Sequence, residues 1–231
     1  MTNVDSTFCV STECVCENNS VGVVGFDCAE KAGTICPKKC HFHNIHEPAK
    51  NGELNCAEYQ VNERANVDQS VDGTSPLYQA VSQGNLDIVK LLVDNTIKNA
   101  SLELKSEETC TSCDRAGDSP LHEAVIKGFD KITELLIASG ANVTSENSLH
   151  NNSQPVHEAC INERPHALQL LITGGADINA RDKTNSTGLI LAASHGNAEA
   201  AKLAVESGAE VNIRDSADNT ALNRATTDWF F

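Results

Sequence analysis

A short sequence motif recurs along this chain at nearly constant intervals. Its fullest copy is Asp118–Ala124 (DSPLHEA), and related copies occupy residues 74–80, 153–159 and 186–192, with a half-copy at 219–222. Measured at the register of Pro120, positions 76, 120, 155, 188 and 221 lie 44, 35, 33 and 33 residues apart. Self-similarity with a period of roughly 20 to 50 residues indicates stacked structural units. The chain is therefore expected to form a row of small units that share a continuous core.

Each unit is expected to be a pair of short helices. Ser119 and Pro120 are residue types that begin a helix, as the N-cap and the first helical residue, and Gly128 is placed to end it. A second helix is expected to be capped by Asp130 and to end before a left-handed Gly140. Its apolar residues fall on one face: Ile132, Leu135 and Leu136. Such a unit cannot bury its apolar faces without neighbours.

The core Pro120-Leu121-His122 with Ala124, repeated near every 33 residues, and the closing Gly140–Val143 (GANV) resemble the ankyrin-repeat family. The resemblance covers roughly residues 70–231. It implies an all-α solenoid of helix–turn–helix units with β-hairpin-like loops and about five repeats. The spelling SPLHEA also resembles ankyrin adaptors with a ubiquitin-ligase-recruiting box, but no such box is expected after residue 231. Small inhibitors resembling the ankyrin domain of NF-κB inhibitors fit equally, so the subfamily stays open.

The repeat register divides the chain into segments. Residues 1–37 are expected to be an irregular, cysteine-rich segment, followed by a solenoid over 38–231. The solenoid is divided into a degenerate repeat at 38–69, a repeat with an insertion at 70–113, regular repeats at 114–148, 149–181 and 182–214, and a partial capping repeat at 215–231. In the degenerate repeat, Pro48 would cost about 3 kcal/mol inside a helix, so that helix should be kinked, shortened or absent.

The charge and the N-terminus indicate the class of partner and the compartment. The formal net charge of −15 disfavours nucleic acid and anionic membranes as partners and suits a protein with a basic surface. The sequence shows no signal peptide and no apolar run of the roughly 18 residues that a membrane span needs, so a cytoplasmic location without membrane insertion is expected. An extracellular location is the alternative if the cysteines form disulfides.

Ten cysteines leave three chemical interpretations open. The pattern of soft ligands near the N-terminus could hold zinc, could form disulfides, or could remain free thiols, and its spacings match no zinc-finger pattern. Cys160 follows His157 in a packed helix and is expected to be an inert core thiol. The candidate zinc ligands are Cys14, Cys16, Cys28, Cys36, Cys40 and His41.

The histidines do not indicate catalysis. His46, His122 and His157 share one position of the repeat, and the family resemblance implies that this residue holds neighbouring loop backbone by hydrogen bonds. No nucleophile elbow, phosphate loop or metalloprotease helix is present, so the chain is not expected to be an enzyme.

The resemblance implies a concave surface that binds protein, formed by the loop tips and the outward positions of each first helix. The expected function is therefore an adaptor, scaffold or inhibitor, with two alternatives: a structural component of a larger assembly, or a metal- or redox-responsive module. Leu191 is expected to face solvent without a partner, and Trp229, Phe230 and Phe231 either cover the last apolar face or dock a partner. The candidate binding residues are Asp72, Thr74, Gln79, Gln83, Arg115, Asp118, Glu123, Lys127, His150, Glu158, Asn162, Lys183, Ser186, Leu191 and His195.

Overall fold

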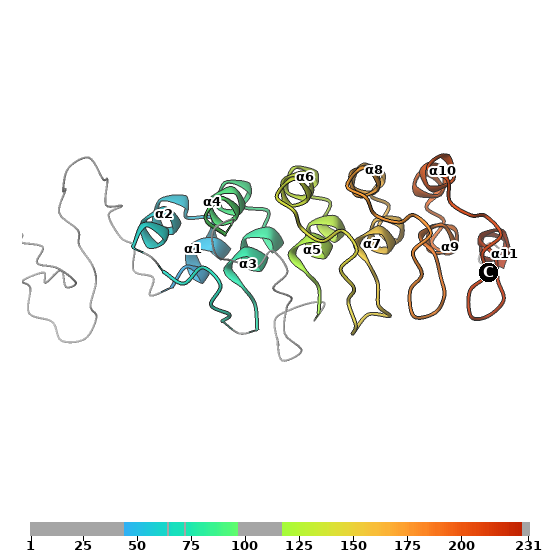
Figure 1. Cartoon of the computed structure of the whole chain (residues 1–231), viewed down its shortest axis with the longest axis horizontal. Coiled ribbons are helices and arrows are strands. Elements are labelled where there is room, and N and C mark those ends of the chain that lie inside the picture. The colour runs from blue at the N-terminus through green and yellow to red at the C-terminus, as the bar shows by residue number, and fades with distance from the viewer. Residues whose placement is uncertain (1–43, 64, 72, 97–116, 228–231) are drawn as a thin grey trace, which may run out of the picture.

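The computed structural model describes residues 44–63, 65–71, 73–96 and 117–227. Within these ranges the chain forms two parallel rows of helices with loops beneath them (Figure 1). The first helices of the units are α1 (His46–Asn51), α3 (Pro76–Ser82), α5 (Pro120–Lys127), α7 (Pro155–Ile161), α9 (Gly188–Ser194) and α11 (Ala221–Thr227). The second helices are α2 (Leu54–Asn62), α4 (Leu86–Thr96), α6 (Asp130–Ala138), α8 (Pro165–Thr173) and α10 (Ala198–Glu206).

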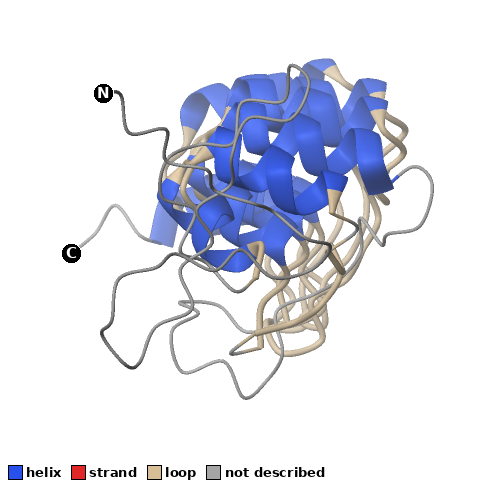
Figure 2. Cartoon of the chain, turned by 90° about the vertical axis from the view of Figure 1, so that its left-hand side faces the viewer, coloured by secondary structure: helices blue, strands red, loops and turns tan. Residues whose placement is uncertain are grey.

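This arrangement confirms the all-α solenoid. Each first helix contacts the next first helix along the row, and the second helices do the same. In the described part of the chain the loops contain isolated β-bridges, at Val71–Thr74 and Asn147–Ser153, and no strand. Figure 2 shows these loops gathered on one side of the helices.

The first helices begin where the repeated sequence motif predicts. Pro120 is the first residue of α5, and the Ser119 hydroxyl accepts a hydrogen bond from the His122 amide. Pro at this position is favourable because the first-turn amides have no intrahelical acceptor. The same reason explains why α1 tolerates Pro48. This proline is the third residue, within the first turn, of a helix that is six residues long.

The second helices begin differently from the expectation. Phe129, not Asp130, is the N-cap residue of α6, and it makes no side-chain cap hydrogen bond. Asp130 is the first helical residue, where its negative charge lies at the positive end of the helix dipole. The Phe129 ring instead packs over Gly84 of the preceding unit, where an added Cβ would lie 2.9 Å from the ring Cζ.

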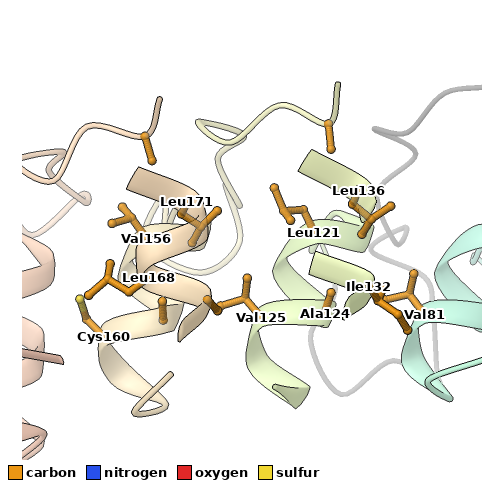
Figure 3. Packing of buried hydrophobic residues seen from close by; sticks show 14 of the residues in the cluster. Val81, Leu121, Ala124, Val125, Ile132, Leu136, Val156, Cys160, Leu168 and Leu171 are labelled. Atoms are coloured by element: carbon orange, nitrogen blue, oxygen red, sulfur yellow. The ribbon is translucent and has the colours of Figure 1, made fainter. Parts of the chain in front are cut away.

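The core is a ribbon between the two rows of helices. Leu121 and Val125 of α5 belong to the same buried cluster as Ile132 and Leu136 of α6 (Figure 3). Leu135 differs from its expected place: it is half-buried at the edge of this cluster, whereas Leu136 is fully buried. Consecutive helical residues point about 100° apart, so only one leucine of the pair faces the middle of the ribbon.

Three of the segments predicted from the sequence fall on residues that are not described. These are the cysteine-rich residues 1–37, the insertion before residue 114, and the aromatic residues 229–231. The expectations for them stay predictions.

Candidate functional site

Three loops beneath the helices, which we call finger loops, are joined into one ladder. They comprise residues 147–153, 182–186 and 215–219, and each is closed by a backbone hydrogen bond between its first amide and its last carbonyl. The Lys183 amide donates to the Asn151 carbonyl at 2.6 Å, and the Ser216 amide donates to the Thr184 carbonyl at 2.8 Å. These bonds fix the register of neighbouring finger loops, and Figure 1 shows the loops in a row beneath the helices.

Buried histidines attach the first helices to the loops. Nδ1 of His122 accepts from the Ser119 amide at 3.3 Å, which leaves Nε2 as the donor to the Ser153 carbonyl at 3.0 Å. His157 repeats the arrangement with the Gln154 amide and the Ala180 carbonyl, both at 3.0 Å. Nε2 of His46 bonds the carbonyl of Gln69.

The environment of His157 favours the neutral ring. Burial lowers the pKa of His157, against the opposing effect of the Ala180 carbonyl and of the carboxylates of Asp182, Glu158 and Glu146. A neutral ring can accept at Nδ1 and donate at Nε2 at the same time. These side chains hold the loops in place, as the resemblance implied.

Five candidate binding residues are buried, and the contacts of three show a structural role. The Asp118 carboxylate accepts from Nδ2 of Asn147 at 2.6 Å. The Thr74 hydroxyl donates to the Val71 carbonyl at 3.1 Å, and the Ser186 amide donates to the Asp182 carboxylate at 2.8 Å. The buried candidates are Thr74, Asp118, Glu123, Glu158 and Ser186.

The other two buried candidates are carboxylates. Oε2 of Glu123 accepts from the Tyr78 hydroxyl of the preceding unit at 3.2 Å, and Oε1 lies 3.7 Å from the Lys127 ammonium. Oε1 of Glu158 accepts from the Ser153 hydroxyl at 2.8 Å, and Oε2 from the Asn162 amide at 3.2 Å. Both carboxylates therefore serve the fold.

The remaining candidates lie at the surface to different degrees. Leu191, Gln79 and Asn162 are partly buried. Leu191 was expected to face solvent and is less exposed than that. Asp72 and Arg115, and all six candidate zinc ligands, lie outside the described residues. The exposed candidates are Gln83, Lys127, His150, Lys183 and His195. We call these five residues, together with the finger loops, the front face.

Two exposed cations were missed by sequence reasoning. Arg181 and Arg214 lie immediately before the second and third finger loops. They occupy the same register, because 214 minus 181 equals the repeat length of 33. The 33-residue period could have identified these two arginines from the sequence alone.

Nowhere in the described residues do three His, Cys, Asp or Glu side chains form a group that could hold a metal ion. Of their two cysteines, Cys56 is in a disulfide and Cys160 is a buried free thiol, whose pKa burial raises to about 12. None of their helices has the length and apolarity needed to cross a membrane.

Comparison with known proteins agrees with this geometry. Residues 45–147 and 151–228 match the family described as ankyrin repeats (3 copies). "Ankyrin repeat and SOCS box protein 11" of Danio rerio is 34% identical over 105 residues, which are 45% of this chain and 32% of that protein. "BRCA1-associated RING domain protein 1" of Caenorhabditis elegans is 34% identical over 82 residues, which are 35% of this chain and 10% of that protein. The chain thus spans a minor part of both relatives, while the family match covers most of its own length: the chain belongs to the ankyrin-repeat family.

Proposed function

We propose that this chain is a non-catalytic protein-binding module, acting as an adaptor, scaffold or inhibitor through its front face. Ankyrin repeats generally mediate protein–protein interaction, and the family is typically non-enzymatic. The observation that carries the proposal is the ladder of finger loops, joined by the Lys183 and Ser216 amides and held to α5 by the bond of His122 to the Ser153 carbonyl. His157 holds the Ala180 carbonyl, just before the second finger loop. A surface fixed in advance loses little conformational entropy when it binds.

The pattern of variation between units supports the same proposal. Gln83, Lys127, Asn162 and His195 occupy equivalent places at the ends of α3, α5, α7 and α9. These four side chains differ in charge and shape, whereas core positions such as Ala80, Ala124, Ala159 and Ala192 are the same in each unit. The chain therefore keeps its fold constant and varies its front face, which is what selective recognition requires.

The test is affinity capture of proteins from a cell extract by the immobilised chain and by two charge-reversal variants. The front variant carries Lys127→Glu and Lys183→Glu, and the control carries Lys131→Glu and Lys202→Glu on the second helices, where both lysines are exposed. We expect proteins captured by the unmodified chain to be lost from the front variant and kept by the control. If both variants capture the same proteins as the unmodified chain, the front face is not the binding surface.

A further inference from the structure

Three exposed cations lie in or immediately before the second and third finger loops, although the net charge of the whole chain is negative. Arg181, Lys183 and Arg214 are exposed in or beside the second and third finger loops, and His150 is exposed in the first. In the described part of the chain, Arg181 and Lys183 have no ion-pair partner, while Arg214 pairs with the exposed Asp218 at 2.7 Å. The net charge of −15 therefore does not describe this surface.

Two of the three carboxylates within the same loops are turned inward, and the third, Asp218, is the exposed partner of Arg214. Oδ1 of Asp182 accepts from the Thr184 and Ser186 amides, both at 2.8 Å. Oδ2 of Asp215 accepts from Nε of Arg224 at 2.9 Å, and its Oδ1 accepts from two backbone amides. Both aspartates are buried, so they present little negative charge to a partner. Other exposed carboxylates near the loops in sequence are Glu146, just before the first finger loop, and Asp177 and Glu210, which lie four residues before Arg181 and Arg214.

The second helices carry the surplus negative charge. Asp94, Glu134 and Glu199 are exposed on α4, α6 and α10. The exposed lysines Lys90 and Lys202 on α4 and α10 already lie near carboxylates, at 3.6 Å and 3.9 Å. Cationic finger loops and acidic second helices thus lie on different parts of the solenoid (Figure 1).

We propose that Arg181 and Lys183, with His150 and Arg214 on the neighbouring finger loops, bind an acidic segment of a protein partner. Backbone hydrogen bonds join the three loops side by side, so one extended segment can contact all of them. Leu149 is 44% exposed beside His150 and would meet an apolar side chain of that segment. This inference rests on the proposed function and reverses the basic partner that the net charge suggested.

A protein segment fits this surface better than a nucleic acid. Binding a phosphate backbone with useful affinity takes many cationic contacts, and the described finger loops offer two cations without an ion-pair partner. A long polyanion would also be repelled by the acidic second helices and by the net charge of −15. A short acidic segment avoids that repulsion.

The experiment is a fluorescence-anisotropy titration of the full chain into three fluorescein-labelled probes. The first is a peptide of Glu, Asp, Leu and Gly, the second has Lys in place of the acidic residues, and the third is single-stranded poly-uridine RNA. We expect the acidic peptide to bind best and its affinity to fall with added salt. Reversal of charge in the double variant Arg181→Glu, Lys183→Glu should weaken that binding by about tenfold, and Lys131→Glu should leave it unchanged.

Three results would overturn the inference: no preference for the acidic peptide over the lysine peptide, tighter binding of the RNA, or equal losses in the finger-loop variant and in Lys131→Glu. Circular dichroism of both variants shows whether they are folded, because all three substituted side chains are exposed. If proteins are lost from the front-face capture variant but the acidic peptide does not bind, the inference fails and the proposed function stands. If capture is independent of the front face, the proposed function fails as well.

Discussion

The side-chain amide of Asn197 donates a 2.7 Å hydrogen bond to the carbonyl oxygen of Cys160 in the preceding unit. A second bond of 2.7 Å goes to the carbonyl of Ile161. Asn85 bonds the Ala49 carbonyl in the same way, at 2.8 Å, and Arg164 bonds the carbonyl of Ile126. Before α4, α8 and α10, the preceding residue thus satisfies carbonyl groups at the end of the first helix of the previous unit.

Replacing Asn197 with Ala should therefore destabilise the solenoid. Two carbonyl oxygens at the end of α7 lose their donor, which should lower the free energy of unfolding by about 1–3 kcal/mol. Urea denaturation followed by circular dichroism measures the change. Asn212→Ala is the matched control, because Asn212 is exposed, and it should unfold at the urea concentration of the unmodified chain.

Cys160 also explains why Gly188 stands where three other units have Pro. A Cβ on Gly188 would lie 2.8 Å from the Cys160 Sγ, inside van der Waals contact. We expect Gly188→Ala to destabilise the chain by about 1–3 kcal/mol through this overlap. With Cys160→Ala as well, the sulfur is absent and the same glycine substitution should become nearly neutral. A double-mutant cycle measures this coupling, and equal costs of Gly188→Ala in both backgrounds would show that the two residues do not compete for space.

The buried His157 should make the fold sensitive to acid. Its folded-state pKa is lowered from 6.5 by burial, so below pH 6.5 the unfolded chain takes up a proton that the folded chain resists. The contribution of His157 is therefore complete above pH 6.5 and is lost as the pH falls below it, by up to about 1.4 kcal/mol per pH unit. Urea midpoints measured between neutral and mildly acidic pH should show this slope. His157→Asn should reduce it and the exposed His166→Asn should not.

The two leucines of α6 should differ in their effect on stability. Leu136 is fully buried and Leu135 half-buried, so Leu136→Ala should cost about 2–5 kcal/mol and Leu135→Ala distinctly less. Thermal unfolding of the two variants compares them directly. Equal losses would mean that the leucines share the core evenly and that the burial difference has no energetic consequence.

Features governed by local rules could be predicted from the sequence. Ser119 and Pro120 begin α5 because capping and a missing amide act within one turn. The prediction that Asp130 is the N-cap of α6 was wrong. Phe129 takes that position, and its ring packs over Gly84 of the previous unit, a contact between units that local rules do not include. The buried state of Glu123 could not be predicted, because its donor Tyr78 lies 45 residues away in sequence.

The candidate site was predicted less well than the fold for the same reason. Glu158 and Asp118 occupy positions that the family resemblance assigns to a binding surface, yet their partners Ser153 and Asn147 draw them inward. The pairing of Asp118 with Asn147 depends on which side chains two neighbouring loops bring together, and periodicity does not encode it. Lys183 stays exposed because its amide, and not its side chain, makes the contact between the finger loops.

The last prediction concerns the C-terminal end of the solenoid, where apolar side chains are exposed. Val205, Val211 and Leu222 are 49%, 50% and 74% exposed. One repeat length earlier, Ile178 and Leu189 occupy equivalent positions and are 8% and 5% exposed, because the following unit covers them. Residues 228–231 follow α11 directly and include Trp229, so we expect these aromatic residues to cover the exposed end.

The fluorescence of Trp229, which is the chain's one tryptophan, tests this directly. Its emission should be shifted to shorter wavelength than that of free tryptophan and should be protected from quenching by acrylamide, since a ring packed on Leu222 is shielded from water. Leu222→Asp should remove both effects, and the exposed Asn223→Asp on the same helix should not. Emission like that of free tryptophan in the unmodified chain would mean that Trp229 stays in solvent, where it is available to a partner. If the emission shift depends on protein concentration, a second copy of the chain, and not the same chain's own aromatic residues, covers the exposed end.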